Sequence, residues 1–373
     1  MKCVKFTGFG FLIFLFLFAC CKNKKKEDEK EGHQEYDRTA LLANMADNII
    51  FPNYDSLKKG VDVLNEKINQ FNLSPSLLEL EKVRSAFKSA YAHWQHCSVF
   101  EFGPAMQENL RLNLNTFPVD STQINNNISS GNYDFDAVVN IDAKGFPALD
   151  YILFTNSYSD TALVNSFVND SKKKSYLADV ATAMKVHIDV VFNAWNPAQG
   201  NYVSTFKTKS GTDVGSSLGE LVNQLSYDLE VLRTAKIGIP LGKKTLGTPL
   251  PKHTEAHFSG ISNELAIEHL KNLENVFLGK SQLGNNGMGL DDYLNFLDAR
   301  HNSSLLSDVI SQSFSSSKSA LQAIPSPLSD AVTINSGEVD HAYMKLQQLV
   351  VLLKADMSSA LAVLITYQDN DGD

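Results

Sequence analysis

The chain has 373 residues, of which 43% are hydrophobic and 20% are charged, and its formal net charge is −9. This length can bury a substantial core, and it permits one large domain or two of ordinary size. The acidic balance argues against nonspecific nucleic-acid binding, which needs a broad basic surface, so we expect no nucleic-acid partner.

The N-terminus has the pattern of a bacterial lipoprotein leader. Two lysines precede an apolar run over residues 9–18, which is too short to span a bilayer but suits the core of a signal peptide. Residues 17–20 (Leu-Phe-Ala-Cys) resemble a lipobox, in which the cysteine is lipidated. We therefore expect residues 1–19 to be a lipoprotein signal peptide, and Cys20 to anchor the chain in the outer membrane. A plain secretory signal or a simple N-terminal membrane anchor is the alternative.

The segment after the leader is polar. Residues 20–36 are dominated by Lys, Glu and Asp, and offer little to bury, so they predict a flexible tether between anchor and body. With Cys20 lipidated, only Cys21 and Cys97 remain, and two cysteines do not make a disulfide framework. Cys97 lies in an apolar helical pattern, which predicts a small buried side chain.

Helical periodicity dominates the first part of the body. Apolar residues recur at three- and four-residue steps over residues 80–94. This predicts a helix with Ser74 as its N-cap that ends before residues 103–104 (Gly-Pro). Residues 113–144 are rich in Asn, Ser, Gly and Asp, which indicates a long loop. A further apolar stripe predicts a helix over residues 177–195.

The stretch from Gly145 to Phe154 joins a loop residue, a proline and a single acid within an apolar run. Pro147 has φ fixed near the helical value, so it suits the first turn of a helix. We expect Asp150 in that same turn, where free N–H groups and the helix dipole stabilise a carboxylate by about 0.3–1 kcal/mol. Asp150 is thus either a helix-terminus acid or a ligand-binding acid.

The second part of the body is also helical. The polar, glycine-bearing segment 200–215 is the best boundary, so we expect an N-terminal helical half over residues 37–205 and a C-terminal helical half over residues 206–373. Apolar periodicity predicts helices over residues 218–232, 263–278, 290–299, 305–324 and 339–364. The predicted fold class is all-α, with two helical-bundle halves packed together.

Two histidine clusters are candidate metal ligands. The sequence contains no His-Glu-x-x-His motif, so it lacks the zinc-binding helix that is commonest in zinc peptidases. His93 and His96 are spaced to share a helix face, although core packing explains this pair better. His253, Glu255 and His257 can hold a transition metal within one turn, but polar loop residues are the favoured explanation.

Several short sequence motifs, taken in their order along the chain, resemble landmarks of the imelysin family. They are Trp94, Phe102-Gly103-Pro104, Arg111, residues 145–154, residues 238–242 (Gly-Ile-Pro-Leu-Gly), residues 249–251 (Pro-Leu-Pro), Glu255, Phe258, Ser259 and the ending 365–373. The central motif, at residues 145–150, resembles the family's Gly-x-His-x-x-Glu motif. Pro147 stands at the histidine position and Asp150 at the glutamate position. Proline has no donor atom, so a His–Glu metal pair cannot form there.

The resemblance implies an all-α envelope protein that handles a ligand or metal in iron uptake. It implies iron or another divalent metal as the cofactor, and envelope transport components as partners. A metallopeptidase of the imelysin type is the alternative, which Pro147 weakens, and a non-enzymatic envelope interaction protein is the third. The resemblance implies ligand-binding roles for Gly145, Asp150, Arg111, Glu255 and Ser259. Arg111 can pair with Asp150 or hold an anionic ligand, because a guanidinium matches carboxylates.

Overall fold

A computed structural model describes residues 35–155 and 159–367. The predicted signal peptide, Cys20 and almost the whole predicted tether lie outside the described residues. In the described ranges the regular secondary structure is helical except for one two-stranded hairpin and an isolated β-bridge between Lys280 and Asn286, so the all-α prediction is confirmed. None of the helices described there combines the length and the apolar character that crossing a membrane requires.

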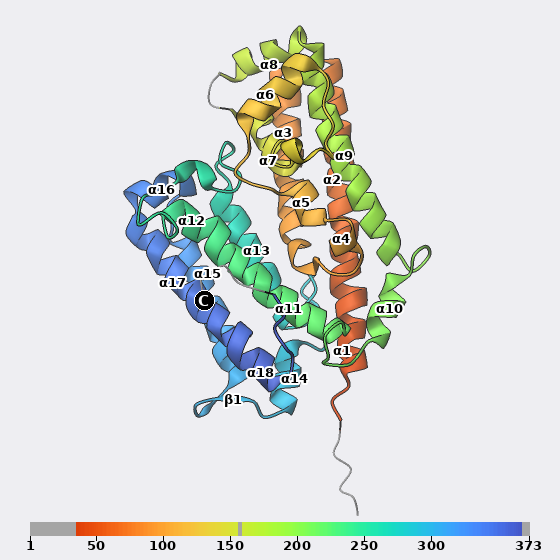
Figure 1. Cartoon of the computed structure of the whole chain (residues 1–373), viewed down its shortest axis with the longest axis vertical. Helices are drawn as coiled ribbons and strands as arrows, with labels where there is room; N and C mark the ends of the chain where they lie inside the picture. Colours follow the sequence, from red (N-terminus) through yellow and green to blue (C-terminus); the bar gives the residue numbers. More distant parts are fainter. Residues whose placement is uncertain (1–34, 156–158, 368–373) are drawn as a thin grey trace, which may run out of the picture. The chain divides into compact units, whose positions relative to one another are not determined.

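Long helices form the first part of the body (Figure 1). The elements up to residue 155 are α1 (Arg38–Asn44), the π-helix η1 (Met45–Ile50), α2 (Phe51–Leu73), α3 (Leu77–Gln95), η2 (Ser98–Phe100), α4 (Pro104–Gln107), α5 (Leu110–Leu114), α6 (Ser121–Ser130), η3 (Val138–Asn140) and α7 (Gly145–Phe154). After them come α8 (Asp160–Val168), α9 (Ser171–Trp195) and α10 (Tyr202–Thr208). α2 packs against both α3 and α9, because each buries an apolar stripe at helical spacing.

The start of α3 differs from the prediction. Ser76, not Ser74, is the N-cap, and its hydroxyl accepts a hydrogen bond from the Glu79 N–H at 3.2 Å. The helix ends at Gln95, before Gly103, as predicted. Cys97 follows it and is buried, as predicted.

The predicted loop over residues 113–144 is wrong in its centre, where α6 forms. The Asp120 side chain caps this helix by accepting the N–H groups of Thr122 and Gln123 at 2.8 and 3.0 Å. Its buried Asn127 donates to the Asn140 side chain at 2.8 Å. Capping and this buried amide contact outweigh the poor helix propensity of the Asn- and Ser-rich sequence.

α7 begins at Gly145, two residues before the proline. Gly145 has a φ of +72°, and a Cβ at this position would lie 2.3 Å from the Leu114 carbonyl oxygen, so the site requires glycine. Because the helix begins this early, Asp150 lies beyond the first turn, and the first-turn prediction for it is wrong.

The later elements also follow the predicted helices. They are α11 (Ser217–Glu230), the π-helix η4 (Val231–Gly238), α12 (Ile239–Leu241), η5 (Pro251–His253), α13 (Ser262–Phe277), α14 (Leu290–Phe296), β1 (Arg300–His301), β2 (Ser304–Leu305), α15 (Leu306–Gln322), α16 (Leu328–Ile334), α17 (Ser336–Val351), the π-helix η6 (Leu352–Met357) and α18 (Ser358–Ala360). α11, α13, α15 and α17 form a packed group of helices. In the antiparallel hairpin Arg300 is opposite Leu305 and His301 is opposite Ser304.

The two parts of the body are in contact. α13 packs against α3, and α11 packs against η2. The chain from Tyr36 onward forms one compact unit. The boundary between two halves near residue 205 stays a prediction.

Candidate functional site

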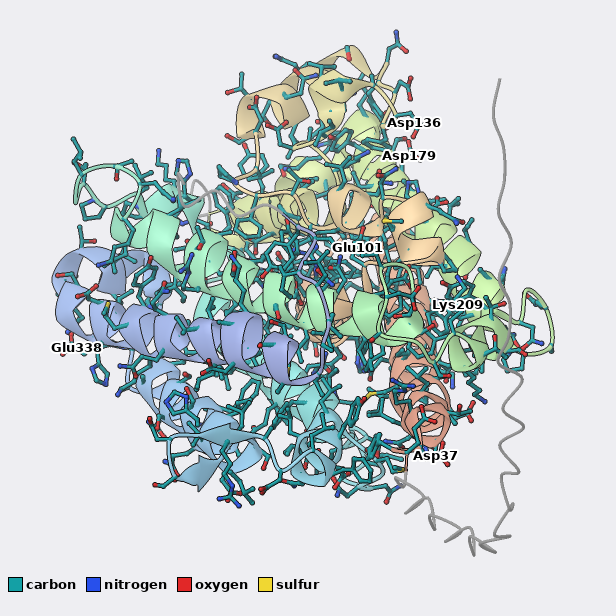
Figure 2. All side chains as sticks on the ribbon, turned by 60° about the horizontal axis from the view of Figure 1, so that its bottom comes forward. Asp37, Glu101, Asp136, Asp179, Lys209 and Glu338 are labelled. Atoms are coloured by element: carbon teal, nitrogen blue, oxygen red, sulfur yellow. The ribbon has the colours of Figure 1, made fainter. Side chains whose placement is uncertain are left out.

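A cavity of about 450 Å³ lies where α3, η2 and α5 face α11, η4 and α13. Three aromatic side chains, Trp94, Phe117 and Tyr227, form part of its lining. Its charged and ionisable lining residues are Glu101, Arg111, Asp228, Lys236 and His269. Glu101 is labelled in Figure 2 among the side chains between these elements. The cavity therefore combines apolar walls with a few convergent polar groups, as small-molecule sites do.

Asp228 is the centre of the buried polar cluster. Its Oδ2 accepts hydrogen bonds from the Ser98 hydroxyl at 2.7 Å and from His269 Nε2 at 2.6 Å. Its Oδ1 lies 2.9 Å from Nη2 of Arg111. Burial raises the pKa of Asp228, but His269 and Arg111 outweigh burial and hold this pKa well below its ordinary value. Asp228 is therefore ionised although it is fully buried.

The proton on His269 follows from this contact. An ionised carboxylate only accepts hydrogen bonds, so Nε2 of His269 carries the proton that Asp228 accepts. Burial lowers the pKa of His269, and the charge of Asp228 opposes this shift. The second ring nitrogen, Nδ1, is buried and has no hydrogen-bond partner among the described residues.

Arg111 joins the two sides of the cavity. Its Nη2 also donates to the Ser98 carbonyl oxygen at 2.6 Å, and its guanidinium carbon lies 5.2 Å from the Tyr227 ring centroid. Its Nε and Nη1 atoms are buried without a hydrogen-bond partner among the described residues. Arg111 thus retains donor capacity beside the cavity.

Glu101 caps the start of α5 from the same wall. Its carboxylate accepts the backbone N–H of Arg111 at 3.1 and 3.2 Å. Burial raises the pKa of Glu101 to about 7, although the nearby Arg111 opposes this shift. Glu101 therefore changes its charge near neutral pH.

Ser98, His269 and Asp228 have the residue types of a hydrolase triad but not its geometry. In a triad one ring nitrogen of the histidine contacts the acid, and the other accepts the serine proton. Here Nε2 of His269 faces both Asp228 at 2.6 Å and the Ser98 hydroxyl at 3.4 Å. The Ser98 hydroxyl donates to Asp228, so no base activates it as a nucleophile.

A second buried network lies behind the cavity wall, around Glu255. Its Oε1 accepts from Asn115 Nδ2 at 2.8 Å and from Gln95 Nε2 at 3.1 Å, and its Oε2 lies 3.0 Å from Lys236 Nζ. Lys236 also donates to the Gln95 side chain. Asn115 and Lys236 line the cavity, so Glu255 positions two of its wall residues. Lys236 comes from the π-helix η4, and such irregular turns are frequent at functional sites.

Asp150 lies outside the cavity lining and is held by backbone donors. Its Oδ2 accepts the Phe258 N–H at 2.8 Å, and its Oδ1 accepts the Ser259 N–H at 3.0 Å. Burial raises the pKa of Asp150 to about 6. Gly145 and Ser259 are also absent from the cavity lining. The ion-pair partner of Arg111 is Asp228 rather than Asp150, and the ligand-binding roles of Gly145, Asp150 and Ser259 stay predictions.

Comparison with known proteins places the chain in a family. The imelysin sequence profile matches residues 50–355. The chain belongs to the imelysin family. Iron-regulated protein A of Synechococcus elongatus is 23% identical to it over 312 residues, which are 80% of this chain and 81% of that protein.

Two solved structures have the same imelysin-type fold. A protein described as an iron-regulated protein A precursor, from Parabacteroides distasonis, has a TM-score of 0.74 at 17% identity, and the match covers 89% of this chain and 97% of that one. An imelysin-like protein from Psychrobacter arcticum has a TM-score of 0.67 at 17% identity, with 88% and 97% covered.

The donor atoms of this imelysin do not suit a bare metal ion. Throughout residues 35–155 and 159–367, no group of three or more His, Cys, Asp or Glu is placed to hold one. His96 pairs with Glu268 at 3.0 Å, and Glu255 pairs with Lys236 at 3.0 Å. The ring of His257 lies edge-on to Phe258. In the described part of the chain, neither histidine cluster therefore forms a three-ligand metal site.

The sequence singled out Arg111, which lines the cavity, but not Asp228 or His269, and the ligand-binding roles predicted for Arg111 and Glu255 stay predictions. Asp228 falls at the apolar helical positions of α11, in register with Leu221, Leu225 and Leu232. His269 falls in the same way on the apolar face of α13. The sequence does place an acid and a histidine on helix faces that are predicted to be buried. Burying a charge without a partner costs much free energy, so this placement could have indicated a buried polar cluster.

Proposed function

We propose that this chain is a ligand-binding protein of the bacterial cell envelope, anchored by lipid on Cys20, that acts in iron acquisition. The observation that supports it is the Arg111–Asp228 pair, with His269 and Ser98, in the wall of a cavity of about 450 Å³. Buried ion pairs often stabilise a fold less than apolar packing does. Their presence beside a cavity with aromatic walls favours ligand recognition.

Iron acquisition is supported by the names of relatives and by the family. Two proteins that this chain resembles are named as iron-regulated protein A or its precursor. The lipobox-like residues 17–20 support an anchor in the outer membrane. A protein anchored there would pass its ligand to envelope transport components.

The rival peptidase function has less support. A metallopeptidase holds its metal with several protein ligands and leaves one position open for water. The motif histidine is replaced by Pro147, and the described residues offer no such ligand set. The orientation of His269 also disfavours serine-type hydrolysis.

Growth under iron limitation tests the proposed function. A strain that lacks the gene receives the wild-type chain, an Arg111→Met variant or a Lys59→Met control. Lys59 is a suitable control because its side chain is 71% exposed and forms an ion pair with Asp55 alone among the described residues. We expect the wild type and the control to restore iron-limited growth and Arg111→Met to fail at equal protein level. Full restoration by Arg111→Met at equal level would contradict the proposal.

A further inference from the structure

The start of the body is held against a part of the chain that is distant in sequence. The Tyr36 ring stacks on the Tyr293 ring with 4.3 Å between their centroids, and it packs against the Phe296 ring at 5.4 Å. The Tyr36 hydroxyl donates to the Gly289 carbonyl oxygen at 3.3 Å. The point where the chain from Cys20 enters the body therefore lies beside α14, and Figure 1 shows α1 and α14 at the same end of the body.

The loop before α14 is held at the same place. Nδ2 of Asn44, the last residue of α1, donates to the Gly279 carbonyl oxygen at 2.7 Å, which fixes the base of the loop over residues 280–286. Within this loop Lys280 and Asn286 form an antiparallel bridge. The loop is therefore an ordered turn that is attached to α1, close to the start of the body.

Apolar side chains are exposed on this side of the body. Leu283, at the tip of the loop, is 90% exposed, and Phe296 and Leu297, at the end of α14, are 43% and 42% exposed. We call these three residues the tether face. Residues 281–289 contain no charged side chain, although 20% of the whole chain is charged. The loop can therefore leave water without moving a charge out of it.

The charged groups near the tether face do not make it basic. The carboxylates of Asp37 and Asp292 accept backbone N–H groups at 2.9 and 3.0 Å. Asp298 pairs with Arg300 at 2.7 Å. Attraction to anionic lipid headgroups therefore adds little at this face, and a contact with lipid depends on its apolar side chains.

We infer that the tether face lies on the lipid bilayer in which the chain is anchored, with Leu283 inserted at the headgroup level. The chain between Cys20 and Tyr36 spans at most about 55 Å when fully extended, so this side of the body stays near the bilayer. Insertion removes apolar surface from water, and the N–H groups of Ser281 and Gly284 are already bonded within the turn at 2.9 Å. This inference rests on the lipid anchor of the proposed function and adds the orientation of the body.

The tether face orients the body but does not replace the lipid. A single acyl chain gives only marginal, reversible membrane binding. Three side chains, two of which are already more than half covered by protein, bury less apolar surface than such a chain. Loss of the lipid on Cys20 should therefore still release the protein from membranes.

Quenching of tryptophan by brominated lipids tests the inference. The lipidated chain is placed in vesicles of phosphatidylethanolamine and phosphatidylglycerol, with plain acyl chains or with bromine near the headgroup end. Trp94 and Trp195 are buried, so the difference from the wild type reports an added tryptophan. In Leu283→Trp we expect brominated lipid to lower the added emission at least about twofold, because interfacial side chains lie about 5–10 Å into the headgroup boundary. High salt should leave this quenching unchanged, because the contact is apolar.

Two further variants separate the tether face from the rest of the surface. Leu73→Trp is the matched control, because Leu73 is 85% exposed but lies at the far end of α2, whose 23 residues span about 35 Å. Its added emission should be the same in both kinds of vesicle. Leu297→Trp provides a second position on the tether face and should be quenched.

Three results would overturn the inference. Equal emission of vesicle-bound Leu283→Trp in plain and brominated lipid, or equal quenching of Leu283→Trp and Leu73→Trp, would do so and would leave the lipid anchor in place. Self-association of the chain in detergent that Leu283→Asp abolishes would assign the face to a second copy instead. Unchanged membrane fractionation of Cys20→Ser would remove the anchor of the proposed function, and the inference would fall with it.

Discussion

Replacing Asp228 with asparagine probes the buried cluster most sharply. Asp228 forms an ion pair with Arg111 at 2.9 Å and accepts hydrogen bonds from His269 and Ser98 at 2.6 and 2.7 Å. Asparagine offers one acceptor oxygen and an NH2 group, so at least one of these donors would face another donor. Removing one partner of a buried ion pair costs about 3–5 kcal/mol. We expect the free energy of unfolding at pH 7 to fall by that amount in Asp228→Asn.

The pH dependence follows from the pKa of Asp228, which is lowered in the folded chain. A lowered pKa means that the carboxylate contributes stability above its unfolded pKa and loses it as the pH falls through the folded pKa. The difference between wild type and Asp228→Asn should therefore be largest at pH 7 and shrink below about pH 4. Urea unfolding followed by circular dichroism at both pH values measures it.

An exposed ion pair provides the matched control. Asp160 pairs with Arg84 at 2.8 Å, and the Asp160 side chain is 56% exposed. Asp160→Asn should change the unfolding free energy by less than about 1 kcal/mol, because solvent screens such pairs. A loss at pH 7 that is no larger in Asp228→Asn than in this control would refute the assignment of Asp228 as a buried, ionised centre.

Three further predictions concern other parts of the chain. Gly145→Ala should lower the free energy of unfolding by at least about 1–3 kcal/mol from backbone strain alone. Gly337→Ala should not, because a Cβ added at Gly337 would have no atom within 4 Å. Equal thermal midpoints for the two variants would contradict this prediction. Burial raises the pKa of Asp150 from 3.8 to about 6, so its contribution is present below pH 3.8 and lost by pH 6. An Asp150→Asn variant should lack that slope, which is worth about 3 kcal/mol in urea unfolding, and a parallel pH profile would show the shift to be absent. Cys20→Ser should release the protein from membranes, and unchanged fractionation would exclude that anchor.

The helices were largely predictable because apolar periodicity encodes them directly. α13 begins and ends within one residue of the predicted positions, and α9 ends at the predicted Trp195 but begins earlier than predicted, at Ser171. The start of α3 was misplaced because Ser74 and Ser76 flank the same proline and are both good N-caps. α6 was missed because its composition favours a loop, and only the Asp120 cap and tertiary packing reverse that preference.

The site was less predictable because its members come from distant parts of the chain. Arg111 was singled out because it resembles a landmark residue of the family. Asp228 and His269 lie on α11 and α13, in segments where no motif singles them out. The motif at residues 145–150 predicted a ligand-binding role for Asp150, which lies outside the cavity lining. Local sequence shows that a polar residue lies on a core face, but only the fold shows which other polar residue it meets.

Diffraction at the iron absorption edge, from crystals of the full chain with a ferric dihydroxybenzoate complex, tests the central claim most directly. The account predicts one anomalous peak inside the cavity lined by Arg111 and Asp228. A peak beside Asp150 and Ser259, or a cavity without iron in crystals that contain the bound complex elsewhere, would contradict it.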